Sequence, residues 1–151
     1  MLKKYRFGFD ISGLVIFLIV MLPNFIWFAV PAPNDILRNE SVTEIVDIIG
    51  SICQVFFVGS LCVVINKERN KLRFSLLIIL SIICVIIYFV GWLLYYNGFA
   101  NPLVILLLTI PPCLAFVFFA LDRKNIIAVV AAVFFTICHL IYAIVNFIFK
   151  F

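Results

Sequence analysis

The stretch MLPNFIWFAVPAPND, residues 21–35, decides how the rest of the chain is interpreted. It ends an apolar run that begins at Ile11, and Pro23 and Asn24 interrupt that run before a polar loop follows. A bilayer core about 30 Å thick needs roughly 20 apolar residues in one helix. Ile11–Val30 has this length, so it is predicted to cross a membrane although it carries a proline and an amide.

Four further apolar segments of similar length follow. The chain has 151 residues, of which 67% are hydrophobic and 12% charged, whereas soluble domains are about 45–50% apolar. This length fits a single domain, residues 1–151. We therefore predict an all-α fold, a polytopic integral membrane protein built as a bundle of five transmembrane helices. The predicted spans are Ile11–Val30, Val42–Ile65, Phe74–Tyr96, Pro102–Leu121 and Ile126–Phe149.

The N-terminal segment MLKKYRFGFD places basic residues before an apolar run, which is also typical of signal peptides. The apolar region of a signal peptide is only about 7–15 residues long and ends at a small-x-small cleavage site. The run here is longer, and no such site follows it. The first span is therefore expected to be retained.

Basic residues are distributed unevenly between the predicted loops. In a five-span model most of them fall on one side of the membrane, and Arg38 and Lys150 fall on the other. Those on the first side are Lys3, Lys4, Arg6, Lys67, Arg69, Lys71, Arg73, Arg123 and Lys124. Because cytoplasmic loops are enriched in lysine and arginine, the N-terminus is predicted to be cytoplasmic and the C-terminus extracytoplasmic.

The same observations bear on location and partners. We expect a multi-pass protein of the plasma membrane, and the abundance of Phe, Ile, Asn and Lys fits an AT-rich bacterial genome. The net charge of +4 is then explained by membrane insertion and by anionic lipid headgroups. The lipid bilayer is the expected partner, and nucleic acid is not.

Two polar motifs predict where helices begin. Ser41 to Glu44 reads SVTE, a capping box whose two side chains would satisfy free N–H groups at the start of span two. Glu44 therefore fits a helix cap better than a ligand group. Asn101 followed by Pro102 is typical of an N-cap and a first helical residue, and predicts the start of span four.

Polar and aromatic residues share a face on four of the predicted helices. An α-helix turns by about 100° per residue, and at this spacing the polar and aromatic residues form stripes on spans one, two, three and five. Each stripe becomes more polar toward the outer face of the membrane. If the stripes converge, they enclose a polar, aromatic-walled cavity that opens outward, with aliphatic packing on its cytoplasmic side. The candidate ligand-binding residues are Asn24, Trp27, Asp47, Gln54, Tyr88, Trp92, His139 and Asn146.

Prolines at the same depth predict helix kinks at Pro23, Pro111 and Pro112. A proline cannot donate to the carbonyl four residues earlier, and its ring clashes with that carbonyl. The freed carbonyls then need partners that lipid does not offer. Two broken helices at one level would place backbone polar groups around a ligand, although packing alone also explains prolines that bend a helix.

Several of these residues also have an interpretation that needs no ligand. Asn24 and Gln54 can hydrogen-bond each other between helices. His139 can be a neutral imidazole bonded to Asn24, Gln54 or Tyr88. The two tyrosines that end span three fit an aromatic belt at the membrane surface; they are Tyr95 and Tyr96.

The chain lacks the common catalytic and metal-binding motifs. All five cysteines lie within spans, so no disulfide framework is expected. Cys53, Cys113 and His139 lie at similar depth, but no ligand spacing supports a metal site. Neither HExxH nor GxSxG occurs. An enzyme is the least favoured class, and no cofactor or metal is expected.

The chain resembles the tryptophan-rich sensory proteins in size and span count. Those five-span proteins bind porphyrin-like ligands, and their signature couples tryptophan to prolines in an early loop. The segment PNFIWFAVPAP, residues 23–33, carries these residue types in inverted order. The resemblance is one of overall shape.

Two functions remain open on the sequence. The first is a receptor, sensor or carrier that takes a small, partly aromatic or cationic molecule from outside. The second is an accessory or immunity-type protein that docks a membrane partner or a second copy of itself. Small residues at Ala128, Ala131 and Ala132 would allow such a close helix approach.

Overall fold

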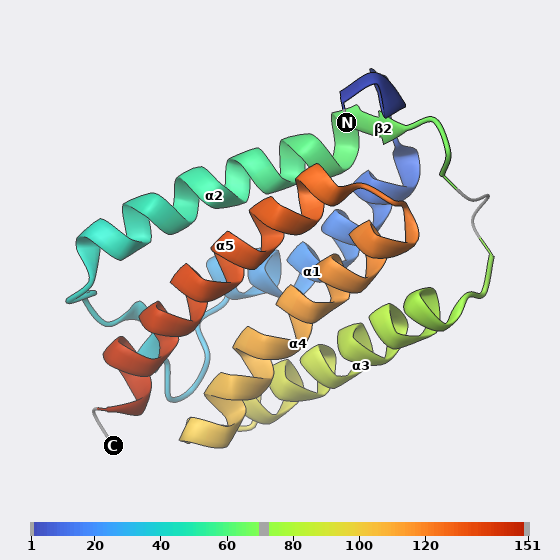
Figure 1. The fold of residues 1–151 in the computed structure, drawn as a ribbon. Helices are drawn as coiled ribbons and strands as arrows, with labels where there is room; N and C mark the ends of the chain where they lie inside the picture. The colour runs from blue at the N-terminus through green and yellow to red at the C-terminus, as the bar shows by residue number, and fades with distance from the viewer. Residues whose placement is uncertain (1, 70–72, 150–151) are drawn as a thin grey trace.

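The computed structural model describes residues 2–69 and 73–149. Lys71 and Lys150, two of the basic residues used to predict orientation, lie outside the described residues. Five helices, each long and apolar enough to cross a membrane, make up most of the fold (Figure 1). They are α1 (Ile11–Ala29), α2 (Glu44–Val63), α3 (Leu76–Tyr96), α4 (Pro102–Asp122) and α5 (Ile126–Ala143). The predicted all-α fold with five long apolar helices is confirmed.

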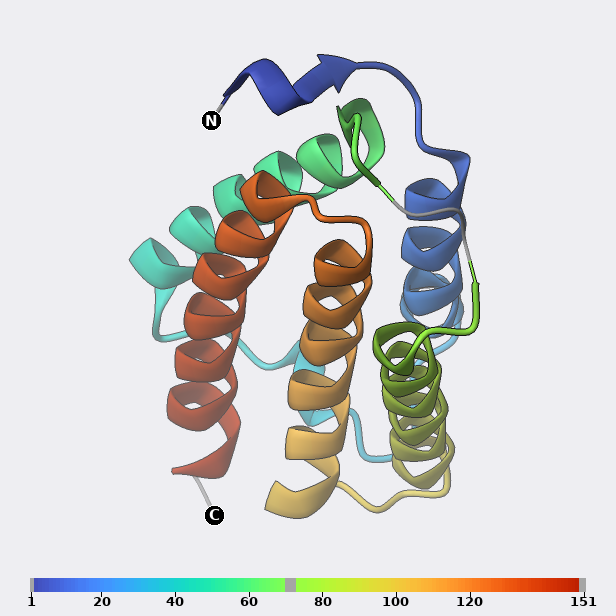
Figure 2. The same cartoon turned by 45° about the vertical axis from the view of Figure 1, so that its right-hand side comes forward.

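The helices neighbour one another in a ring. Helices α5, α4 and α3 stand side by side, while α2 and α1 pack behind them (Figure 2). Helix α4 is the most buried of the five. In its most apolar stretch of 18 residues, 61% of the residues are buried, against 33% or less in the corresponding stretch of the other four helices. Because the number of helices is odd, the two chain ends lie at opposite ends of the bundle (Figure 2).

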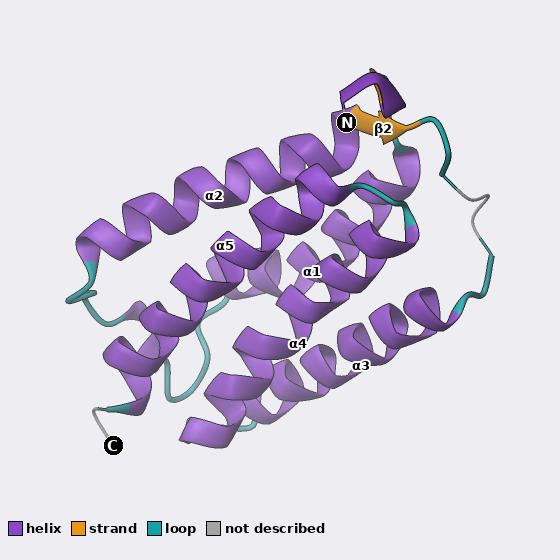
Figure 3. Ribbon diagram, in the orientation of Figure 1, coloured by secondary structure: helices purple, strands orange, loops and turns teal. Residues whose placement is uncertain are grey.

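Short elements are found at the ends of the long helices (Figure 3). They are η1 (Leu2–Lys4), β1 (Tyr5–Phe7), η2 (Ile36–Arg38), β2 (Val64–Asn66) and the π-helical turn η3 (Ile144–Ile148). Strands β1 and β2 pair antiparallel. Helix α2 is two residues shorter at each end than the predicted span Val42–Ile65: it begins at Glu44, and the chain leaves the helix at Val64 to pair with the N-terminal segment.

The end of the bundle that holds β1 and β2 is called the strand end below, and the end that holds residues 30–43 is called the loop end. Asp10 organises the strand end. Its carboxylate accepts from the N–H of Ser12, which caps α1, and it forms ion pairs with Arg69 and Arg123. Asp10 is 6% exposed, so two cations offset the cost of burying its charge.

One of the two predicted helix starts is confirmed. Asn101 accepts from the N–H of Val104, and α4 begins at Pro102. The predicted SVTE capping box is wrong, because the N-cap of α2 is Thr43 and Glu44 is exposed. Asn146 of η3 instead contacts the segment before α2: its Oδ1 accepts from the N–H of Val42 at 2.7 Å.

The three prolines inside helices do not interrupt them. Helix α1 continues through Pro23 to Ala29, and α4 continues through Pro111 and Pro112 to Asp122. The helices are therefore not the discontinuous ones that two proline breaks at one level would have produced. All three prolines are buried, so packing within the bundle covers them.

The three alanines at the start of α5 are buried within this chain. Ala128, Ala131 and Ala132 are 0%, 6% and 1% exposed. Ala128 lies beside Asn125, whose amide donates to the carbonyls of Ser60 and Val64 on the neighbouring chain segment. The small side chains thus serve internal packing and are not available as a docking face for a partner.

Candidate functional site

Side chains from all five helices line an interior cavity of about 320 Å³. Part of each predicted polar stripe reaches it. Five of the eight candidate residues line this cavity: Asn24, Gln54, Tyr88, Trp92 and His139. Helix α4, for which no stripe was predicted, contributes Thr109, Pro112 and Cys113.

Aromatic rings form much of the cavity wall. The rings of Phe57 and Phe116 meet edge to face at 4.7 Å, and Phe57 stacks on Phe135 at 5.8 Å. Phe135 in turn stacks on His139 at 5.2 Å. Phe57, Phe116 and Phe135 all line the cavity, so aromatic side chains make up part of its wall.

One hydrogen bond connects α1 and α3 at the cavity wall. The Asn24 amide donates to the Tyr88 hydroxyl at 2.7 Å. Asn24 therefore bonds between helices as a packing interpretation requires, but its partner is Tyr88 and not Gln54. The Tyr88 hydroxyl accepts this bond, so its own proton is free to be donated into the cavity.

Three polar side chains at the cavity lack partners among the described residues. Gln54 and His139 make no side-chain hydrogen bond there, so His139 is not bonded to Asn24, Gln54 or Tyr88. The Nε1 of Trp92 is buried and makes no hydrogen bond of ordinary geometry, and its neighbour Tyr88 interacts with it only weakly, with ring centroids 6.3 Å apart. An amide, an imidazole and an indole thus present unused donors and acceptors to one space.

The cavity wall is mostly apolar, and its polar groups are uncharged. No aspartate, glutamate, lysine or arginine is among the described residues that line it. A net charge in a bundle interior is costly without a partner, whereas neutral donors and acceptors can be satisfied by a neutral group of matching shape. The cavity is therefore suited to an uncharged, partly aromatic molecular fragment.

A second pocket of about 220 Å³ lies between α2 and α5, and we call it the α2–α5 groove. Asp47 and Ser51 line it, as do four residues that also line the interior cavity. The shared residues are Gln54, Phe135, His139 and Tyr142. Asp47 is thus brought close to Gln54 and His139 as predicted, but through this groove and not through the cavity itself.

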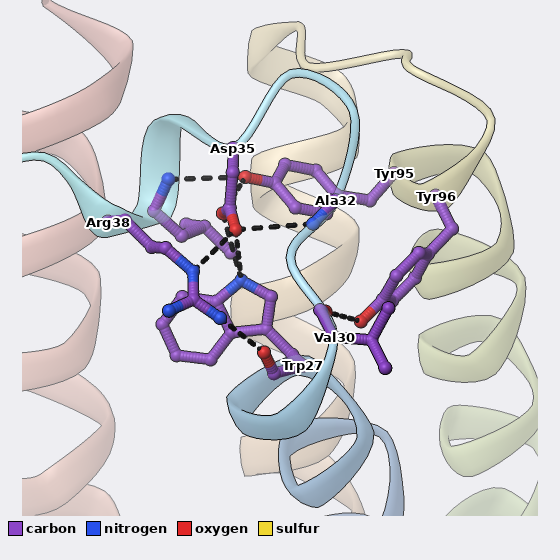
Figure 4. A network of polar contacts seen from close by, with 8 residues as sticks. Trp27, Val30, Ala32, Asp35, Arg38, Tyr95 and Tyr96 are labelled. Carbon is purple, nitrogen blue, oxygen red and sulfur yellow. Dashed lines mark hydrogen bonds and ion pairs between the residues drawn. The ribbon is translucent and has the colours of Figure 1, made fainter.

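The candidate residue Trp27 does not line the cavity. Its indole donates to Asp35 in a network that closes the loop end (Figure 4). Asp35 also accepts from Tyr95 Oη at 2.9 Å and from Arg38 Nε at 2.8 Å. Arg38 lies over the Trp27 ring, 4.8 Å from its centroid. Trp27 therefore fastens the loop between α1 and α2.

The same network corrects the interpretation of Tyr95. It is 0% exposed and accepts from the N–H of Leu37 at 3.1 Å while donating to Asp35, so it does not belong to an aromatic belt. Tyr96 reaches the loop as well, by donating to the carbonyl of Val30 at 2.7 Å. The sequence offered one signal for this network, the oppositely charged Asp35 and Arg38 three residues apart.

The loop also forms part of the cavity wall. Leu37 lines the cavity at the loop end, where the sequence predicted an outward opening. Its N–H is held by Tyr95, so this part of the wall is anchored to α3. The polar space that adjoins the cavity is the α2–α5 groove.

The candidate residue Asn146 is also structural. It is 1% exposed, and its amide donates to Thr43 Oγ1 at 2.6 Å and to the carbonyl of Tyr142 at 3.0 Å. With the bond from Val42, its side-chain groups are satisfied by protein. Asn146 therefore joins the start of α2 to the end of α5.

Among the described residues, no three histidine, cysteine, aspartate or glutamate side chains gather closely enough to hold a metal ion. No family model matches this chain, and no curated protein or solved structure matches it either.

Proposed function

We propose that this protein binds a small, partly aromatic molecule in its interior cavity and acts in a membrane as a sensor or carrier of that molecule. Asn24, Gln54, Tyr88, Trp92 and His139 are the proposed contacts. The volume of the cavity lies at the lower end of the roughly 300–1,000 Å³ typical of ligand pockets.

The unpaired state of Gln54, Trp92 and His139 carries the proposal. A buried polar group without a hydrogen bond costs roughly 1–3 kcal/mol in proteins, and lipid cannot supply the missing partner. A chain that only needed a packed bundle would be more stable with apolar residues at these positions. Of the three, the Trp92 Nε1 is buried and therefore incurs this cost, whereas Gln54 and His139 are half-buried. A molecule that bonds to all three side chains explains why they face one hollow.

The membrane arrangement is part of the proposal. The described basic residues lie mainly at the strand end, and Arg38 lies at the loop end. By the positive-inside rule, the strand end faces the cytoplasm and the loop end faces outward. A bacterial plasma membrane is the proposed location.

A thermal-shift screen of the purified protein in a non-ionic detergent, against metabolites and lipids, tests the proposal. A ligand that binds only the folded state at 100 times its Kd adds about 2.7 kcal/mol to the free energy of unfolding. Gln54→Leu and Trp92→Phe should weaken the shift caused by a hit while leaving the unliganded protein folded. Phe56→Leu is the matched control, because Phe56 is on the same helix as Gln54 and is 62% exposed.

Two results would count against the proposal. One is a wild-type protein that no compound stabilises. The other is a set of hits whose shifts are the same in Gln54→Leu, Trp92→Phe and wild type, because such compounds would bind elsewhere. Docking of a partner chain would then be the better explanation, and crosslinking in native membranes would test it.

A further inference from the structure

We infer that the ligand carries a positively charged amino group, which Asp47 binds in the α2–α5 groove while the aromatic part of the ligand occupies the interior cavity. This inference rests on the proposed function of the cavity and adds the chemical class and the orientation of the ligand.

The groove and the cavity adjoin each other. Gln54, Phe135, His139 and Tyr142 line both, and the inference is that one molecule reaches from one space into the other past these four side chains. The His139 and Tyr142 rings are nearly parallel, at 9° with centroids 6.3 Å apart. Both rings line the groove and the cavity, so a planar group in either space can stack against them.

Asp47 lacks a counter-charge among the described residues. Its Oδ1 accepts from the Thr43 hydroxyl at 3.0 Å, and no ion pair with it is formed within the described ranges. Asp35, the other partly buried acid near this end, is paired with Arg38. A partly buried carboxylate is costly unless a cation offsets its desolvation, so Asp47 is suited to an ammonium group from a ligand.

Asp47 lies in the first turn of α2, where the positive end of the helix dipole stabilises the charged form of its carboxylate. Glu44 shares that environment, but it is exposed and lines neither pocket. A second observation concerns the adjoining cavity: it is lined by Trp92, which is 5% exposed and whose Nε1 is buried without a hydrogen bond of ordinary geometry. A carboxylate and a buried donor thus line two adjoining spaces.

Matched pairs of small aromatic probes test the inference. Tryptamine and 3-(2-hydroxyethyl)indole share one ring system and differ only in a terminal amine or hydroxyl, and tyramine and 4-(2-hydroxyethyl)phenol do the same. Their Kd values are measured by calorimetry on the full chain in a non-ionic detergent. We expect the wild type to bind each amine about tenfold more tightly than its alcohol, as for a hydrogen bond to a charged group.

Two variants separate the ligand site from the helix dipole. Asp47→Asn keeps an oxygen that accepts from Thr43 but removes the charge, and it should bring the amine and the alcohol of each pair to within about twofold. Glu44→Gln removes the same charge from the same helical turn outside both pockets, and it should keep the tenfold preference. Thermal unfolding of both variants without ligand checks that each is folded.

The inference is overturned if the wild type binds the alcohols as tightly as the amines, or if the preference persists in Asp47→Asn. It also fails if no member of either pair binds. Alcohols that bind equally well and are weakened by Gln54→Leu would overturn the charge assignment alone and leave the proposed function standing, whereas the library screen decides the proposed function itself.

Discussion

Trp27 Nε1 donates to both carboxylate oxygens of Asp35, at 2.8 and 3.0 Å (Figure 4). The two residues are eight positions apart, one near the end of α1 and the other in the loop that follows. Tyr95 from α3 donates to the same carboxylate at 2.9 Å. This carboxylate therefore joins α1, the loop and α3, and it determines how the loop lies over the cavity.

Replacing Asp35 should destabilise the protein. Asp35→Asn removes the charge and leaves donors from Trp27, Arg38 and Tyr95 competing for a single amide oxygen. Hydrogen bonds to charged groups are worth about 1.5–3 kcal/mol, so we expect the free energy of unfolding to fall by about 2 kcal/mol in a detergent denaturation series. Glu40→Gln, an exposed acid in the same loop, should change it by less than about 0.5 kcal/mol. Equal effects of the two variants would contradict the network.

The same carboxylate predicts an acid-sensitive stability. Burial raises the pKa of Asp35, but hydrogen bonds outweigh burial and hold the pKa below its ordinary value of 3.8. The donors are Trp27, Arg38, Tyr95 and Ala32. The folded protein therefore binds this proton less readily than the unfolded chain does. The contribution of ionised Asp35 to the free energy of unfolding is complete above the ordinary pKa, and it is lost as the pH falls through the pKa of the folded state.

The free energy of unfolding should therefore be measured for the wild type and for Asp35→Asn from pH 6 down to about pH 2.5. We expect the difference between the two proteins to shrink in the acid range. A stability difference that stayed constant over that range would show that ionisation of Asp35 does not contribute.

Gly13 should be intolerant of a side chain. A Cβ at this position would lie 2.8 Å from the carbonyl oxygen of Leu61, and backbone atoms cannot move aside as a flexible side chain can. Gly13→Ala should force α1 and α2 apart and cost about 1–3 kcal/mol. Gly59→Ala is the control, since a Cβ there meets nothing within 4 Å. Alanine is favoured over glycine in a helix, so Gly59→Ala should be neutral or slightly stabilising in the same assay.

Asn146 should matter for stability and not for ligand binding. Asn146→Ala removes the acceptor for the N–H of Val42 and the donor to Thr43, so we expect a loss of about 2 kcal/mol through unpaired backbone and side-chain groups. Asn97→Ala removes only a bond to Leu93 within its own helix and should cost less than about 0.5 kcal/mol. If Asn146→Ala changed the affinity for a hit without changing thermal unfolding, Asn146 would belong to the ligand site after all.

Local sequence patterns predicted the parts of the site that depend on helix periodicity. Gln54 and His139 were placed on inward faces because polar residues recur at helical spacing, and both line the cavity. Asn146 lies on the same stripe as His139, yet it is bonded to the chain before α2. Periodicity gives the face on which a side chain lies but not the partner that it meets.

Contacts between segments that are distant in the sequence explain where the sequence-based predictions differ from the structure. The SVTE motif has the residues of a capping box, but an amide 104 positions later bonds the N–H of Val42. Strands β1 and β2 have three residues each, too few for an alternating pattern to be recognised, and each depends on the other for its hydrogen bonds. Trp27 was assigned to the ligand because a polar aromatic residue near other polar residues has the same sequence signature whether it binds a ligand or a loop.

The sequence by itself determined the class of the protein and the number and approximate ends of its apolar helices, because these depend on the length of each apolar run and on the charges between runs. Only the tertiary structure decided which polar side chains are satisfied by protein and which remain free at the cavity. The reason is that a hydrogen bond is made or lost over a few tenths of an ångström between helices, and nothing local to either helix specifies that distance.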